Sequence, residues 1–126
     1  MKLVIGGYAQ GKLDFVLANW SVPGYAVWDG ALPGHREEGQ TLILDRFHSW
    51  VKRRILEGGC PEEEILAFLD RWGDCIIISD EVGSGIVPND PFEREYRERV
   101  GRILIKLAAR AERVERVICG IGQRIK

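Results

Sequence analysis

The chain has 126 residues and a mass of 14.3 kDa, which is the size of one domain spanning residues 1–126. Hydrophobic residues at 45% and charged residues at 29% are ordinary globular values and exclude a disordered or fibrous chain. The net charge of −1 does not support nucleic-acid binding, and no apolar run is long enough to cross a bilayer, so neither partner is expected.

Strands and helices are expected to alternate along the first part of the chain. Short apolar runs predict strands at residues 2–5, 25–28 and 41–44. Apolar side chains that recur on one helical face predict helices over 11–20, over 46–57 and from Pro61 onward. Residues 29–40, rich in Gly, Pro and charged side chains, are expected to form a loop.

The clearest predicted strand covers residues 74–79, where four consecutive apolar residues indicate a strand covered on both faces, as in a parallel sheet. A loop over 80–90, a helix over 91–112 and a strand over 114–119 follow. The helix has an apolar stripe formed by Phe92, Tyr96, Val100, Leu104, Leu107, Ala108 and Ala111. This order indicates an α/β fold with a mostly parallel sheet, whose ligands bind at the carboxyl ends of the strands.

A glycine-rich turn follows the first predicted strand. It reads Gly6-Gly7-Tyr8-Ala9-Gln10-Gly11-Lys12 and has the G-x-x-x-x-G-K spacing of a phosphate-binding P-loop between a strand and a helix. Its N–H groups and the helix N-terminus would face phosphate oxygens, and Lys12 would reach the outer phosphates. Leu13 stands where Ser or Thr would bind Mg²⁺. The alternative is a plain strand-to-helix turn with a solvated lysine.

Acidic residues follow two further predicted strands. Asp45 comes directly after Leu44 and is similar to a Walker B carboxylate that holds Mg²⁺, although it could also simply cap the next helix. The second acidic segment reads Asp80-Glu81-Val82-Gly83-Ser84-Gly85-Ile86-Val87-Pro88. Its glycines would let the backbone approach a ligand closely, and the alternative is a plain acidic turn.

The histidines and cysteines give weaker signals. His35, in the loop 29–40, could act as a nucleophile or base, and His48 is interpreted as structural or close to the ligand. Cys60, Cys75 and Cys119 lack metal or redox spacing, and their odd number argues against a disulfide framework. We expect reduced thiols, with Cys75 and Cys119 buried in strands, and a cytoplasmic protein.

These motifs together resemble the adenosylcobinamide kinase / adenosylcobinamide-phosphate guanylyltransferase family of cobalamin biosynthesis. The resemblance rests on the turn ending in Lys12, on Leu42-Ile-Leu-Asp45 leading to Trp50, and on the acidic segment 80–88 before a helix rich in arginine. It extends to the segment Cys119-Gly-Ile-Gly-Gln-Arg-Ile-Lys126 and covers nearly the whole chain.

The resemblance implies a RecA-like P-loop fold and a homotrimer. It implies phosphorylation of a cobinamide hydroxyl with GTP or ATP, followed by GMP transfer through a histidine. In this interpretation Lys12 and the backbone from Gly6 to Gly11 hold phosphates, Asp45 holds Mg²⁺, and Glu81 orients or deprotonates the acceptor hydroxyl.

Three departures from the family pattern favour a second hypothesis. Leu13 replaces the Mg²⁺-binding hydroxyl, Asp80 replaces an asparagine, and the segment with the guanylylated histidine is shortened to residues 29–40, which leaves only His35. We therefore expect histidine-dependent guanylyl transfer to be absent. The protein is either an enzyme of this family or a catalytically degenerate relative that binds a nucleotide or corrinoid.

Overall fold

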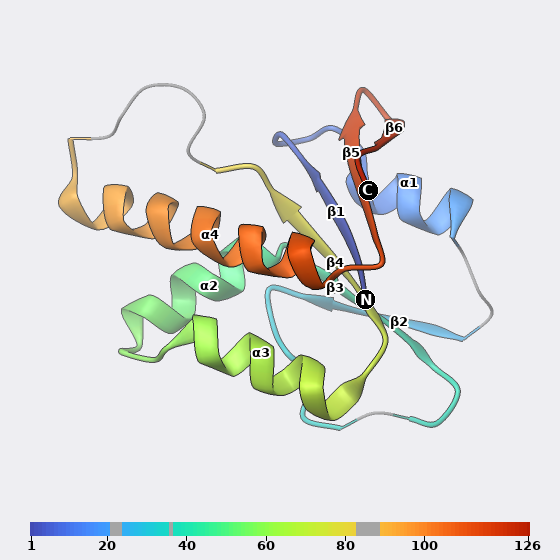
Figure 1. Ribbon diagram of the computed structural model, residues 1–126, viewed down its shortest axis with the longest axis horizontal. Helices are drawn as coiled ribbons and strands as arrows, with labels where there is room; N and C mark the ends of the chain where they lie inside the picture. The colour runs from blue at the N-terminus through green and yellow to red at the C-terminus, as the bar shows by residue number, and fades with distance from the viewer. Residues whose placement is uncertain (21–23, 36, 83–88) are drawn as a thin grey trace.

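A six-stranded sheet forms the centre of the protein (Figure 1). The computed structural model describes residues 1–20, 24–35, 37–82 and 89–126. The strands, in chain order, are β1 (Lys2–Gly6), β2 (Tyr25–Asp29), β3 (Thr41–Asp45), β4 (Cys75–Asp80), β5 (Arg113–Ile118) and β6 (Ile121–Arg124). Their spatial order is β2-β3-β4-β1-β5-β6, with β1 to β5 parallel and β6 antiparallel to β5. This is the expected α/β fold with a mostly parallel sheet.

Helices cover both faces of the sheet. In the described residues they are α1 (Lys12–Asn19), α2 (Phe47–Leu56), α3 (Pro61–Trp72) and α4 (Pro91–Arg110). Figure 1 shows α2, α3 and α4 grouped on one side of the sheet and α1 on the other. Helix α1 joins β1 to β2 in one direction across the sheet, whereas the other helices join strands in the opposite direction. Because crossovers between parallel strands have the same hand, α1 lies on one face of the sheet and the other helices lie on the other face.

The inner strands are buried on both faces because their side chains alternate between two apolar clusters. In β4, Ile77 packs in the larger cluster under α2, α3 and α4, whereas Ile76 and Ile78 pack in the smaller cluster under α1. Leu3 and Val4 of β1 divide in the same way. The prediction that residues 74–79 are covered on both sides is therefore confirmed.

The C-terminal segment differs from the expectation. The chain turns back after β5 through Cys119 and Gly120, and β6 pairs with β5, with Ile118 opposite Ile121. Cys75 is buried as expected, but Cys119 is exposed in this turn, so its predicted burial in a strand is wrong. Strand β5 ends at Ile118, and Cys119 adopts a φ of 50° as the first residue of the turn, so it is not part of the strand.

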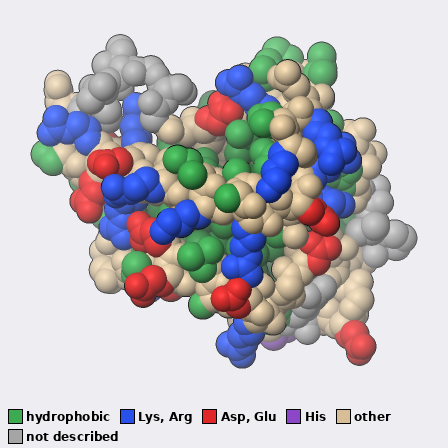
Figure 2. Space-filling model, viewed as in Figure 1, with side chains coloured by type: hydrophobic (Ala, Val, Ile, Leu, Met, Phe, Trp, Pro, Cys, Tyr) green, Lys and Arg blue, Asp and Glu red, His purple; other side chains and the backbone are tan. Residues whose placement is uncertain are grey.

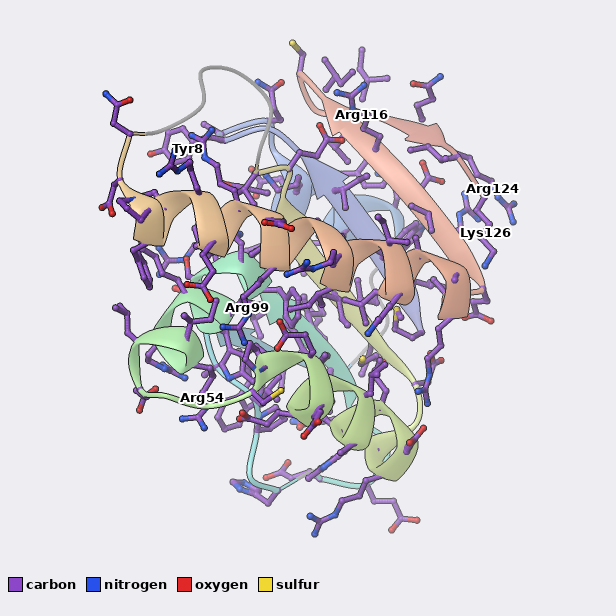
Figure 3. The ribbon with its side chains drawn as sticks, turned by 60° about the vertical axis from the view of Figure 1, so that its left-hand side comes forward. Tyr8, Arg54, Arg99, Arg116, Arg124 and Lys126 are labelled. Carbon is purple, nitrogen blue, oxygen red and sulfur yellow. The ribbon has the colours of Figure 1, made fainter. Side chains whose placement is uncertain are left out.

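The solvent-facing side of α4 carries intermixed charges, as Figure 2 shows. Arg102 pairs with Glu98 one turn away. Arg99 donates two hydrogen bonds of 2.8 and 3.0 Å to Glu62 of α3, which lowers the pKa of Glu62 to about 2 and ties the two helices together (Figure 3). Within the described residues, no helix combines the length and apolar character needed to span a membrane.

Candidate functional site

The loop from Gly6 to Lys12 lies at the carboxyl end of β1, whose neighbours in the sheet are β4 and β5. A Cβ at Gly6 would lie 2.5 Å from the Val117 carbonyl oxygen, so only glycine fits there. Ala9 and Gly11 have φ values of 55° and 80°, which curl the backbone. Tyr8 and Ala9 form a turn, and none of the N–H groups from Tyr8 to Leu13 donates a hydrogen bond of good geometry to the part of the chain that the structure describes. Such free donors form an anion-binding concavity.

These N–H groups border a pocket of about 390 Å³. Three segments that are far apart in the sequence form it: the loop after β1 with the start of α1, the end of β3 with the start of α2, and the end of β4. The lining residues are Tyr8, Ala9, Gln10, Gly11, Lys12, Leu13, Asp14, Asp45, Arg46, His48, Ile78, Ser79 and Asp80. The pocket therefore occupies the position expected for a ligand site of a parallel sheet.

Lys12 is buried beneath the loop. Its side chain is 8% exposed, and its Nζ donates to the Gly7 carbonyl oxygen at 2.7 Å and lies 2.6 Å from Asp80 Oδ1. The alternative interpretation of this turn required a solvated lysine, and the buried position of Lys12 does not agree with it. Its amine is held at the pocket, already in contact with a carboxylate.

Asp80 and His48 form a second contact at the end of β4. The Asp80 N–H donates to His48 Nδ1 at 3.0 Å, and His48 Nε2 lies 3.3 Å from Asp80 Oδ2. With Nδ1 accepting, the neutral ring carries its proton on Nε2, the nitrogen nearer to the Asp80 carboxylate. Burial lowers the pKa of His48, although the Asp80 charge acts in the opposite direction. Asp80 therefore contacts Lys12 with one oxygen and His48 with the other.

Asp45 faces the same pocket from the end of β3. Its Oδ1 accepts the Arg46 N–H at 2.9 Å, and burial raises its pKa, partly opposed by this hydrogen bond. Arg46 adopts a φ of 49° and pairs through its guanidinium with Asp29 at the end of β2, with Nη2 at 2.9 Å from Oδ2. Arg46 was not anticipated from the sequence, and no local pattern marks it, because its partner comes from another strand.

Comparison with known proteins identifies the family of the chain. The model of the cobinamide kinase / cobinamide phosphate guanyltransferase family matches residues 18–125. The chain belongs to this family. The match begins after the loop 6–12.

Curated relatives support the same membership. The chain is 43% identical over 51 residues to the "Bifunctional adenosylcobalamin biosynthesis protein CobU" of Salmonella typhimurium, over 40% of this chain and 28% of the relative. The Escherichia coli protein of the same name gives the same values. The "Bifunctional adenosylcobalamin biosynthesis protein CobP" of Pseudomonas aeruginosa is 28% identical over 104 residues, 75% of this chain and 58% of the relative. The matches thus span between 28% and 58% of the length of these relatives.

Glu81, the first residue after β4, lies outside the pocket lining of this family member. Its carboxylate pairs with Arg116 of β5 through contacts of 2.8 and 3.0 Å, and its N–H donates to the Gly6 carbonyl oxygen at 2.7 Å. Val82 packs partly against the larger apolar cluster. The remaining residues predicted to form the substrate loop, Gly83, Ser84, Gly85 and Pro88, lie outside the described residues.

His35 is exposed in the connection between β2 and β3 and does not line the pocket. Its ring lies edge-on to Trp28, with 6.4 Å between the ring centroids. The neighbouring Leu32 packs against the larger cluster, on the face covered by α3. The structure therefore does not bring His35 to the residues of the loop 6–12.

The pocket offers few protein oxygens for a cation, which suits a metal ion held mainly by a bound phosphate ligand and water. Leu13 lines the pocket and packs partly against the cluster under α1, so it offers no oxygen. Among the described residues, no group of three or more His, Cys, Asp and Glu side chains could hold a metal ion. Asp45 supplies one carboxylate, which suits Mg²⁺ bound chiefly by phosphates and water, as is usual for that ion.

Proposed function

We propose that this protein binds a nucleoside triphosphate, GTP or ATP, with the phosphates in the loop from Gly6 to Lys12, and that it transfers a phosphoryl group to a cobinamide hydroxyl in cobalamin biosynthesis. The observation that supports the proposal best is the row of free N–H groups from Tyr8 to Leu13 beside the buried Lys12 amine. Curled backbone donors and a lysine are the arrangement that receives phosphate groups.

The roles of the side chains follow from their positions. Lys12 would bind an outer phosphate once that phosphate replaces Asp80 at its amine. Asp45 would hold Mg²⁺, which when bound neutralises phosphate charge. Glu81, at the edge of the site, would orient or deprotonate the acceptor hydroxyl after leaving Arg116. Phosphoryl transfer of this kind depends mainly on positioning and charge stabilisation.

Two observations favour a second function, in which the chain binds a nucleotide or corrinoid without transferring a group. Leu13 cannot bind a cation, and His35 lies outside the pocket lining. We propose that guanylyl transfer through a histidine is absent in either case. Mass spectrometry after incubation with GTP tests this, because a stable GMP adduct on His35 would contradict it. The homotrimer implied by the family resemblance and the cytoplasmic location expected from the cysteines are also proposals, and sedimentation tests the first.

Calorimetric titration of the whole chain tests the proposed function. We expect GTP or ATP to bind with one site per chain and more tightly with Mg²⁺ than without it. Radioactive phosphate transfer from the preferred nucleotide to cobinamide separates the enzyme from the binding relative. Absence of binding by GTP and by ATP, with and without Mg²⁺, would contradict the proposal.

Replacement of Leu13 by threonine is expected to increase the effect of Mg²⁺ on nucleotide affinity. The hydroxyl would add a second protein oxygen to the carboxylate of Asp45, and hard cations bind oxygen ligands. We expect the ratio of affinities with and without Mg²⁺ to rise several-fold. Leu17→Thr is the matched control, because Leu17 packs against the same cluster from α1 but does not line the pocket. An unchanged ratio in Leu13→Thr would show that the cation does not reach position 13.

A further inference from the structure

The loop after β1 is hydrogen-bonded to the turn between β5 and β6. The Gly120 N–H donates to the Gln10 carbonyl oxygen at 2.8 Å, and the Cys119 N–H donates to Gln10 Oε1 at 2.7 Å. Gln10 thus accepts both N–H groups of the turn, one with its main chain and one with its side chain. Figure 1 shows the loop and the β5–β6 turn side by side.

The turn between β5 and β6 has a defined backbone geometry, which directs its N–H groups toward the two Gln10 oxygens. Cys119 and Gly120 form a two-residue connection between paired Ile118 and Ile121, with φ values of 50° and 75°. This left-handed conformation is typical of a type I′ hairpin, whose strands are held in a fixed twist. The turn is therefore a rigid feature, and its N–H groups point outward from the hairpin toward the loop.

The backbones also approach closely. A Cβ added to Gly11 would lie 3.5 Å from the Gly120 Cα, and Gly11 itself has a φ of 80°. On the other side, Tyr8 is 86% exposed and lies away from the hairpin that carries Arg116 and Arg124, as Figure 3 shows. The hairpin thus supports the second half of the loop, next to Lys12, and leaves its tip open.

We propose that Gln10 is a positioning residue for phosphate binding. By joining the loop to the β5–β6 turn, it fixes the direction of the N–H groups that flank it. This inference rests on the proposed function, because it concerns the same loop. Donors held in place before a ligand arrives bind it with less loss of conformational entropy, so Gln10 can affect affinity through the loop that it holds.

The variant Gln10→Leu removes the Oε1 acceptor while keeping the size of the side chain and the main-chain acceptor. We expect nucleotide affinity to fall roughly threefold to tenfold, the range for one net hydrogen bond, with the melting temperature nearly unchanged. In ligand-free protein, we expect faster exchange of the Cys119 amide hydrogen and lower NMR order parameters for the N–H groups from Tyr8 to Leu13. Gln123→Leu is the matched control, since Gln123 is exposed on β6, opposite Arg116 of β5.

The two measurements separate this inference from the proposed function. Equal affinities of wild type and Gln10→Leu, or unchanged order of the loop in the ligand-free variant, would overturn the role of Gln10. If wild type binds no nucleotide but the loop loses order in Gln10→Leu, the proposed function fails while the support of the loop by Gln10 holds.

Discussion

Replacement of Lys12 by alanine is expected to cause the largest loss of nucleotide binding. The Lys12 amine is buried at the pocket and lies 2.7 Å from the Gly7 carbonyl oxygen, so alanine leaves this buried position without a cation. Hydrogen bonds to charged groups contribute about 1.5 to 3 kcal/mol each. We therefore expect affinity for GTP or ATP, measured by calorimetry, to fall roughly tenfold to a hundredfold.

Two further variants make this result interpretable. Lys106→Ala removes an exposed lysine from α4 and is expected to leave affinity unchanged. Lys12→Ala leaves Asp80 without its cation, which can lower stability. If it does not fold, Lys12→Met combined with Asp80→Asn is compared with Asp80→Asn alone, so that only the lysine differs. A folded Lys12 variant that binds the nucleotide as tightly as its own reference protein, wild type or Asp80→Asn, would contradict phosphate binding by this lysine.

Replacement of Asp80 by asparagine is expected to increase nucleotide affinity. Asp80 Oδ1 lies 2.6 Å from Lys12 Nζ, so an arriving phosphate must compete with a carboxylate for the same amine. Charges about 6 to 10 Å apart at an effective dielectric constant of about 20 repel by about 1.5 to 3 kcal/mol. Asparagine keeps an oxygen for Lys12 but carries no charge, and we expect an increase in affinity of roughly tenfold or more.

Parallel titrations of wild type and Asp80→Asn check this prediction. Glu63→Gln, at an exposed position on α3, is the control for loss of one negative charge and is expected to have little effect. The increase should be smaller at high salt, since repulsion between partly exposed charges is screened. An affinity that stays the same or falls in Asp80→Asn would mean that Asp80 holds Lys12 in its binding position.

Much of the fold could be predicted because local patterns determine it. The apolar run Cys75–Ile78 indicates a strand buried on both faces, and this strand lies near the centre of the sheet between β3 and β1. Strand β6 could not be predicted in this way. It has one apolar residue, Ile121, and it forms because the Cys119-Gly120 turn returns the chain onto β5.

The candidate site could be predicted only in part. The spacing from Gly6 to Lys12 marks a loop between a strand and a helix, and the structure places it beside Asp45 in one pocket. The contacts of Asp80 with Lys12 and of Glu81 with Arg116 depend on which strands are neighbours, which local patterns do not determine. His48, interpreted from the sequence as structural or close to the ligand, lines the pocket.

A crystal structure of the whole chain with a non-hydrolysable GTP or ATP analogue and Mg²⁺ tests the central claim most directly. The account predicts phosphate oxygens within hydrogen-bond distance of the N–H groups from Tyr8 to Leu13 and of Lys12 Nζ, with Asp80 displaced from the lysine. A nucleotide bound elsewhere, for example in the groove between Leu32 and Phe68, with those N–H groups free of phosphate, would contradict it.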